Sequence, residues 1–294
     1  MAAVTVGLPF RDARDSLADA IRSIFAQSFT DWELLLVDDG STDGSLEIAR
    51  RVRDPRVRVA SDGKHRRLPA RLNQIAAEAR GELLARFDAD DLMHPDRLAR
   101  QVALLTERPA LDLVGTACFA MDRAGEIIGI VASEPPRVNP WHVLRRGLLA
   151  HATLLCRRAW CRAHPYDERF PRAEDRELYC RTAGEVRFAH LGEPLYFIRY
   201  RKGAGAMRRD YVRTCRDNRR VFVRHAPRLV GPLGVVPLVA ESFAKEAIFC
   251  GLSALGLQGR LLAARGRAVT EEEVDRAREA LRRVQRTDVT GLDR

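Results

Sequence analysis

Residues 32–39 read Trp-Glu-Leu-Leu-Leu-Val-Asp-Asp, and residues 83–91 read Leu-Leu-Ala-Arg-Phe-Asp-Ala-Asp-Asp. Each stretch is a short, mainly apolar run that ends in aspartates. Short continuous apolar runs are typical of strands that are covered on both faces, as in parallel sheets. Both aspartate groups therefore follow predicted buried strands, and they lie at the edge of an open α/β sheet where ligands bind.

The patterns around these two runs alternate between strand and helix. Strands are predicted at Val4–Leu8, Trp32–Val37, Val57–Ala60, Leu83–Phe87 and Leu111–Cys118. Helices are predicted at Ser16–Gln27, Asp43–Arg53, Leu68–Arg80 and Pro95–Glu107. This order predicts an α/β fold in which a mostly parallel sheet is flanked by helices.

The alternation loosens after about Gly125. Further elements are expected as strands at Ala152–Cys156, Val186–His190 and Leu195–Tyr200, and as a helix at Ala173–Thr182. From about Gly203 the pattern becomes helical, and we expect a C-terminal helical appendage.

The C-terminal region contains an apolar segment, Leu229–Leu257, which Glu241, Lys245 and Glu246 interrupt. A membrane-spanning helix needs roughly 18 uncharged apolar residues. We therefore expect the segment to pack on the rest of the chain, with contact to a membrane surface as the alternative. Thr270 and Glu273 form a capping box ahead of a helix that ends near Arg286.

The composition describes a chain with a sizeable core and a basic surface. Of 294 residues, 46% are hydrophobic and 31% are charged, and the net charge is +10. Arginine supplies most of this charge, and its planar fork binds phosphates and carboxylates, so anionic partners are expected. A GC-rich genome also produces an Arg-rich composition, and both interpretations stay open. Because no aromatic–basic interleaving or finger motif accompanies the charge, nucleic-acid binding is not expected.

The cysteines and the N-terminus indicate the compartment. Six cysteines occur without Cys-x-x-Cys spacing, and we expect reduced core thiols rather than disulfides or a zinc site. Val4–Pro9 is too short for the apolar core of a signal peptide and follows no basic residue. These features predict a cytoplasmic protein, with peripheral contact at the inner face of the membrane as an extension of that prediction.

The aspartates themselves predict a metal site. Carboxylates gathered at one sheet edge repel each other unless a cation lies between them. A hard divalent ion such as Mg²⁺ or Mn²⁺ takes oxygen ligands and can bind a diphosphate. Turn chemistry is the alternative: Ser41 belongs to a favourable turn, and Asp43 or Asp91 can cap a helix. That alternative is weaker for Asp88 with Asp90, since alternate carboxylates are a costly way to form a turn.

Several motifs occur in a fixed order. They are Pro9 after the first strand, Gln27–Leu34 leading into Val37–Asp43, Arg71-Leu72-Asn73, Gly81-Glu82 before Phe87–Asp91, and Pro95–Leu98. This succession resembles the large family 2 of nucleotide-sugar glycosyltransferases, which have the GT-A fold. The resemblance covers about Val4 to Arg201. It implies a catalytic domain at 1–202, with nucleotide-sugar binding at 1–118 and an acceptor half at 119–202, and an appendage at 203–294.

The resemblance implies a role for individual residues. Pro9 would line the nucleotide base pocket, and Asp39 with Asp38 would hydrogen-bond the base or ribose. Arg71 would reach the nucleotide, although a surface helix arginine is the alternative. Asp88 would contact the ribose or a metal-bound water, and Asp90 would bind the metal.

A third acidic motif lies downstream at Glu174-Asp175. It resembles the family motif whose aspartate is the general base in inverting members, so Asp175 would be the catalytic base beside Glu174. The usual aromatic residue is replaced by Arg176, which puts substrate inferences in doubt. Without the upstream motifs, the pair would be interpreted as acidic residues at a helix N-terminus.

Two further positions follow from the resemblance. His151 stands where members have residues near the donor sugar, although a structural histidine is the alternative. The family's histidine after the last strand is absent, and Arg201 or Lys202 would touch the diphosphate in its place.

The implied enzyme is an inverting glycosyltransferase with a divalent metal, Mg²⁺ or Mn²⁺. Its donor would be a UDP-, dTDP- or GDP-linked sugar, and its acceptor a saccharide or lipid-linked saccharide in polysaccharide or glycolipid synthesis. A metal-dependent nucleotidyltransferase is a rival, but Leu8–Asp12 offers no Gly-rich phosphate loop. A non-catalytic GT-A scaffold is the other rival, although Asp90 and Asp175 are both present.

Overall fold

The computed structural model of the chain describes residues 2–122, 124–200, 204–254 and 266–292. The first half alternates strand and helix as expected. Its elements are β1 (Val4–Phe10), α1 (Leu17–Phe25), β2 (Trp32–Asp38), α2 (Ser45–Arg51), β3 (Val57–Ser61), α3 (Leu68–Glu78), β4 (Leu83–Arg86), β5 (Leu92–Met93), α4 (Arg97–Glu107) and β6 (Leu113–Met121).

The second half is more irregular. It contains β7 (Ile127–Val131), α5 (Pro140–Arg146), the 3-10 turn η1 (His151–Thr153), β8 (Leu155–Arg157), α6 (Arg158–Ala163), α7 (Glu174–Arg181), β9 (Phe188–Arg199), α8 (Ala204–Val230), the 3-10 turn η2 (Pro232–Gly234), α9 (Val235–Ala254) and α11 (Glu271–Gln285).

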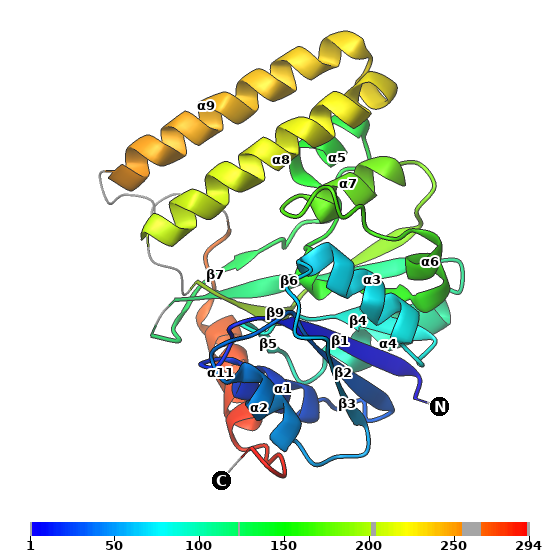
Figure 1. Cartoon of the computed structure of the whole chain (residues 1–294), viewed down its shortest axis with the longest axis vertical. Coiled ribbons are helices and arrows are strands. Elements are labelled where there is room, and N and C mark those ends of the chain that lie inside the picture. Colours follow the sequence, from blue (N-terminus) through cyan, green and yellow to red (C-terminus); the bar gives the residue numbers. More distant parts are fainter. Residues whose placement is uncertain (1, 123, 201–203, 255–265, 293–294) are drawn as a thin grey trace.

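The strands form one sheet in the order β3-β2-β1-β4-β8-β6-β9-β5, and β7 pairs with β6 (Figure 1). The strands β3, β2, β1 and β4 are mutually parallel, which confirms the expected α/β arrangement. Beyond β4 the sheet is mixed, because β8 runs antiparallel to both β4 and β6, whereas β6 and β9 are parallel. In the parallel part, Asp38 is opposite both Phe10 and Ser61, so the ends of β1, β2 and β3 are aligned.

Both faces of the sheet are covered, as the apolar run in β2 predicts. Leu34 and Leu36 pack in the core cluster that contains side chains of α1, α2 and α4. Leu35 and Val37 point to the opposite face, where α3, α5, α7 and α8 contribute to a second cluster. The alternation follows from the two-residue repeat of a strand, and it fixes β2 as a central, fully covered element.

The last part of the chain contributes two distinct structures. In Figure 1, α8 and α9 run side by side and lie over α5 and α7. The chain then returns to the sheet, where Ala277, Ala280 and Val284 of α11 pack with Ala26 and Leu92. Among the described helices, none is long and apolar enough to cross a membrane.

The capping-box prediction is confirmed. Thr270 accepts a hydrogen bond from the Glu273 backbone N–H, and the Glu273 carboxylate accepts one from the Thr270 N–H. The helix that follows ends at Gln285, next to Arg286 as expected. Of the Leu229–Leu257 segment, α9 packs chiefly along α8, and its buried residues include Leu238 and Phe249.

Several expectations for the second half are wrong in detail. The two strands expected at Val186–His190 and Leu195–Tyr200 are one long strand, β9, whose pairing with β6 shifts register twice. The strand expected from Ala152 begins only at Leu155, after the η1 turn. β5, β7 and α6 were not expected. β5 is two residues long, so it carries no periodic signal.

The expectation that all cysteines are reduced is also wrong. Cys156 at β8 and Cys161 in α6 form a disulfide, with Cα atoms 6.8 Å apart. Because α6 follows β8 directly, the chain reverses and brings residues five apart in sequence together. The other cysteines, Cys118, Cys180, Cys215 and Cys250, are free.

Candidate active site

Pro9 and Asp38 both lie at the carboxyl ends of β1 and β2, where Phe10 is the register partner of Asp38. Pro9 is buried and lies opposite Val37 in the parallel register. Asp38 accepts hydrogen bonds from the Ser41 backbone N–H at 2.9 Å and from the Ser61 hydroxyl at 2.7 Å. Burial opposes its ionisation, but these hydrogen bonds outweigh burial and lower the pKa of Asp38. The carboxylate therefore closes the loop after β2 and ties it to β3.

Asp39 is almost completely engaged by its own chain. Its two oxygens accept backbone N–H groups of Arg66 and Arg67, with a shortest distance of 2.7 Å. They also contact His65 Nδ1 at 2.8 Å and accept from Arg71 Nε at 2.9 Å. Asp39 is 6% exposed and Arg71 1% exposed.

Arg71 extends this network rather than projecting into solvent. Its guanidinium also donates to Asp62 at 2.6 Å and to Gln74 at 2.8 Å. The alternative of a surface helix arginine therefore does not hold. The side chain instead braces the 62–67 loop against the carboxyl edge of β2.

The second acidic run forms a cluster. One carboxylate oxygen from each of Asp88, Asp90 and Asp91 lies within 4.8 Å of the others. Asp91 is buried and accepts from the Tyr196 hydroxyl at 3.0 Å and from the Arg199 backbone N–H at 2.8 Å. Burial, followed by the charges of Asp90 and Asp88, raises the pKa of Asp91 well above its ordinary value.

These residues fit a divalent cation. Three carboxylates at this separation offer the oxygen ligands that Mg²⁺ and Mn²⁺ prefer, and a bound cation would remove their mutual repulsion. Asp90 is exposed, and Asp88 accepts from Arg86 Nη1 at 2.6 Å. The alternative in which Asp91 caps a helix does not hold, because α4 begins at Arg97 with Asp96 at its cap position.

Glu174 and Asp175 begin α7, on the other side of the sheet edge. Glu174 is 7% exposed, with one oxygen 3.6 Å from His151 Nδ1. Burial, followed by the charge of Asp175, raises the pKa of Glu174 to about 8. Asp175 is half-buried and accepts from the Arg176 backbone N–H at 2.7 Å. Glu174 is therefore a carboxyl group that readily stays protonated, directly beside Asp175.

His151 belongs to a hydrogen-bonded chain that connects two helices. Its Nε2 lies 2.8 Å from the Tyr166 hydroxyl. The backbone of Tyr166 exchanges two hydrogen bonds with the side-chain amide of Asn73 in α3, at 2.8 and 3.0 Å. Burial and the nearby Arg86 charge lower the pKa of His151 well below its ordinary value, so the ring is held neutral.

Arg86 is a site residue that sequence reasoning missed. It ends β4, is 9% exposed, and pairs with Asp88. Its charge acts on both halves of the site, because it also lowers the pKa values of Tyr166 and Tyr196 against the stronger effect of burial. A single arginine within the apolar run Leu83–Phe87 was the available signal. Tyr196, which anchors Asp91, gave no comparable signal within its apolar strand.

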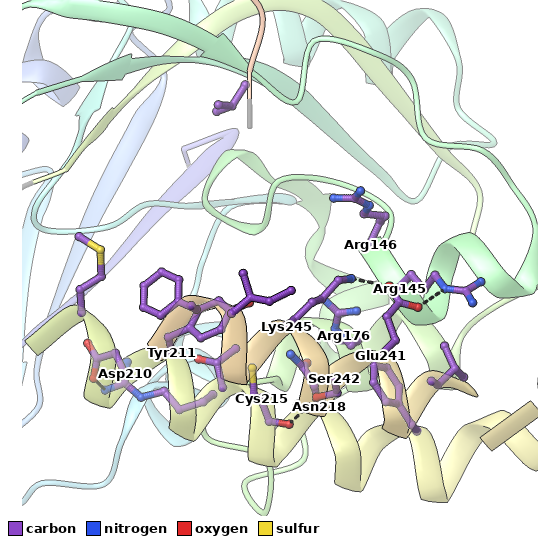
Figure 2. Close-up of a pocket in the computed structure, with 18 of the residues that line it drawn as sticks. Arg145, Arg146, Arg176, Asp210, Tyr211, Cys215, Asn218, Glu241, Ser242 and Lys245 are labelled. Atoms are coloured by element: carbon purple, nitrogen blue, oxygen red, sulfur yellow. Dashed lines mark hydrogen bonds and ion pairs between the residues drawn. The ribbon is translucent and has the colours of Figure 1, made fainter. Parts of the chain in front are cut away.

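A large cavity opens beside this edge, between the sheet and the α8–α9 pair. Its volume is about 1130 Å³, and its lining includes Asp90, Arg176 and Arg199. Figure 2 shows a close-up of the cavity in which Arg176 is labelled. The cavity therefore joins the acidic cluster to the start of α7. Arg201 and Lys202, expected to touch a diphosphate, lie outside the described residues.

Comparison with known proteins assigns a family to this arrangement. Residues 5–127 match the family model described as glycosyl transferase family 2. EpsE of Bacillus subtilis (strain 168), a protein classed with the glycosyltransferases, is 33% identical over 246 residues. That alignment covers 81% of this chain and 87% of EpsE.

Solved structures share the fold. S. aureus TarS 1-349, determined in complex with UDP, has a TM-score of 0.59 at 18% identity and covers 96% of this chain and 79% of its own. The mannosyltransferase PcManGT from Pyrobaculum calidifontis, determined with GDP-Man and Mn²⁺, has a TM-score of 0.58 at 18% identity. That superposition covers 97% of this chain and 86% of PcManGT.

Proposed function

This chain belongs to glycosyltransferase family 2, and we propose that it is an inverting, divalent-metal-dependent enzyme that transfers a sugar from a nucleoside-diphosphate donor to an acceptor hydroxyl. The observation that carries the proposal is the placement of the Asp88–Asp90–Asp91 cluster and the Glu174–Asp175 pair around Arg86. The two acidic groups are close enough to interact, because the charge of Asp88 raises the pKa of Glu174. The positive charge of Arg86 lowers the same pKa. Such an arrangement can bind a diphosphate and hold a base beside it.

The donor would lie along the carboxyl edge of the parallel strands. Pro9 and Asp38 border this edge, and Asp39 with Arg71 braces the loop next to it. The ligands of the two structural neighbours, UDP in TarS and GDP-Man with Mn²⁺ in PcManGT, support a nucleotide donor of this class. UDP-, GDP- and dTDP-linked sugars are the candidates.

The metal would be held by Asp90 with Asp88 and Asp91, and it would supply positive charge to the departing diphosphate. Asp175 would accept the proton of the acceptor hydroxyl, which attacks the anomeric carbon. The bond from that carbon to the diphosphate oxygen breaks as the new glycosidic bond forms on the opposite face, so the configuration inverts. His151, held neutral and oriented by Tyr166, would border the sugar without adding charge.

Calorimetric titration with UDP, GDP and dTDP tests the donor half of the proposal. We expect one nucleotide to bind in the presence of Mn²⁺, and binding to weaken strongly with EDTA and in Asp90→Asn. Asp31→Asn, an exposed aspartate before β2, is the matched control. If no nucleotide binds under any condition, a non-catalytic scaffold becomes the better conclusion.

Peripheral contact at the cytoplasmic face of a membrane is part of the proposal, because it would suit a lipid-linked acceptor in polysaccharide or glycolipid synthesis. Its support is a set of large apolar side chains exposed along α8, η2 and α9, namely Val223, Leu233, Val236, Phe243 and Ile248. The sequence of α8 is rich in arginine, and basic residues attract anionic headgroups. Flotation with vesicles containing phosphatidylglycerol should carry the protein upward at low salt. Protein that stays at the bottom of the gradient would contradict the contact.

A further inference from the structure

The cavity next to Asp90 has a strongly cationic far end. Four basic side chains gather there, Arg145 and Arg146 from α5, Arg176 from α7 and Lys245 from α9 (Figure 2). Arg172 and Arg199 add to the lining, and the carboxylates among the described lining residues are Asp90, Asp210 and Glu241. Since Asp90 belongs to the acidic cluster, the rest of the cavity carries a clear excess of positive charge.

Some of these cations are neutralised inside the chain. Glu241 of α9 accepts from Arg145 Nε at 2.7 Å and from Lys245 Nζ at 2.5 Å, as the dashed lines in Figure 2 mark. Arg172 donates to Asp210 at 2.8 Å. These pairs hold α9 to α5 and α8 to the loop before α7. Arg199 pairs with Asp19 at 3.3 Å, so Arg146 and Arg176 are the two arginines of the cavity considered next.

Arg176 and Arg146 have no carboxylate within ion-pair distance in the described part of the chain. Arg176 donates to the backbone carbonyl of Leu144 and lies over the Phe222 ring at 5.9 Å. Arg146 is exposed, and it lines the same cavity as Arg176 and Lys245, as Figure 2 shows. Burial lowers the pKa of Arg176, so a nearby anion would relieve a real electrostatic cost.

The position of these two arginines connects them to the chemistry. Arg176 follows the proposed base Asp175 directly, and the same cavity reaches Asp90. The cavity volume of about 1130 Å³ slightly exceeds that of most ligand pockets, which span roughly 300–1,000 Å³. A saccharide bound there can therefore extend from the arginines toward Asp90, where the donor diphosphate would lie.

We propose that the cavity binds the acceptor, and that the acceptor carries an oxoanion, a phosphate or a carboxylate, held by Arg146 and Arg176. The guanidinium fork matches the two oxygens of either group. This inference rests on the proposed function, because it assigns the acceptor class of the same site. It also explains why Arg176 stands where the family motif has an aromatic residue.

Binding of three probes with related rings tests the inference: glucose 6-phosphate, glucuronate and glucose. The titrations are made by NMR in EDTA and without nucleotide, so that the metal and donor sites do not contribute. We expect one or both anionic probes to bind at least roughly 10-fold more tightly than glucose, as two charge-assisted hydrogen bonds allow. Preference for glucose 6-phosphate identifies a phosphate acceptor, and preference for glucuronate identifies a carboxylate one. Equal binding of all three probes, or none, overturns the inference.

Arg146→Gln should remove most of the preference for the anionic probe while the thermal unfolding midpoint stays unchanged, since this side chain is exposed. Arg50→Gln is the matched control, because Arg50 is likewise an exposed arginine in the last turn of a seven-residue helix. Arg176→Gln should act in the same direction, although its partial burial also affects folding. Nucleotide binding should survive in Arg146→Gln and be lost in Asp90→Asn, so failure of the anion site and failure of the donor proposal are distinguishable. An unchanged preference in Arg146→Gln contradicts the inference.

Discussion

The two ends of the ligand-binding region treat charged side chains in opposite ways. Beside β2, Asp39 and Arg71 are buried and satisfied by groups of their own chain. In the cavity below α8 and α9, Arg146 and Arg176 lack a carboxylate partner in the described structure, and Asp90 is exposed. A buried ion pair such as Asp39–Arg71 holds the fold in place, whereas cationic side chains without a carboxylate partner, such as Arg146 and Arg176, can bind an anionic ligand. The Asp39–Arg71 end is therefore preformed in the folded chain, whereas the charges of Arg146 and Arg176 in the cavity are neutralised only when a ligand binds.

The largest expected effect separates a catalytic carboxylate from a structural one. Asp175→Asn should reduce kcat by roughly 10²- to 10⁴-fold, because an amide cannot accept the hydroxyl proton. Its stability in urea should stay close to that of the wild type, since the half-buried Asp175 carboxylate makes few contacts with the chain. Transfer to an acceptor is measured by product formation, and the anomeric configuration of the product is determined by NMR.

Asp39→Asn is the contrasting variant. It places an amide among the N–H donors of Arg66, Arg67 and Arg71. We therefore expect its main effect to be a lower free energy of unfolding rather than a lower kcat. If Asp175→Asn were destabilised but fully active, Asp175 would be a structural carboxylate like Asp39, and the contrast between the two ends would be wrong.

The second prediction tests the internal network itself. Arg71→Met should lower the free energy of unfolding by about 3–5 kcal/mol, because it leaves a buried carboxylate without its cation. Arg66→Met is the control, since its ion pair with Asp62 is largely exposed and such pairs contribute at most about 1 kcal/mol. Urea unfolding of both variants gives the comparison. Equal stability of the two, with UDP binding lost only in Arg71→Met, would make Arg71 a nucleotide ligand instead.

The smallest effect is a dependence of stability on pH. The folded-state pKa of Glu174 is raised from 4.5 to about 8, so between these values the folded chain keeps a proton that the unfolded chain releases. Its contribution to stability is therefore full below about pH 4.5 and decreases as pH rises toward 8. Between pH 5 and 8 the free energy of unfolding of the wild type should decrease by roughly 1–3 kcal/mol relative to Glu174→Gln. The maximum for a single titrating group is about 1.4 kcal/mol per pH unit, or about 4 kcal/mol over this range.

Urea unfolding at several pH values in EDTA measures this difference. Glu168→Gln, which changes an exposed glutamate in the loop before α7, is the control. A constant offset between Glu174→Gln and the wild type at all pH values would mean that Glu174 titrates alike in the folded and unfolded chains.

The parallel half of the fold was predictable because its signals are local. The run Leu34–Val37 indicated a strand covered on both faces, and both core clusters confirm it. The acidic run after β4 likewise predicted a metal site, and one carboxylate oxygen from each of Asp88, Asp90 and Asp91 lies within 4.8 Å of the others. Strand ends in a parallel sheet share one edge, so the position of an aspartate in sequence translates directly into its position in space.

The remaining parts depended on contacts between distant segments. Whether Asp91 caps α4 or faces the cluster was decided by Tyr196 and Arg199, more than a hundred residues away. Arg71 became an internal brace only because the 62–67 loop folds back over Asp39. The disulfide and the return of α11 to the sheet have the same origin. The amino-acid pattern alone established the α/β class, the acidic edge and the family, since these depend on local periodicity and ordered motifs. Tertiary packing decided which charged side chains are paired within the chain and which can bind a ligand. The partners of a charged side chain are its neighbours in space, and these are often distant in sequence.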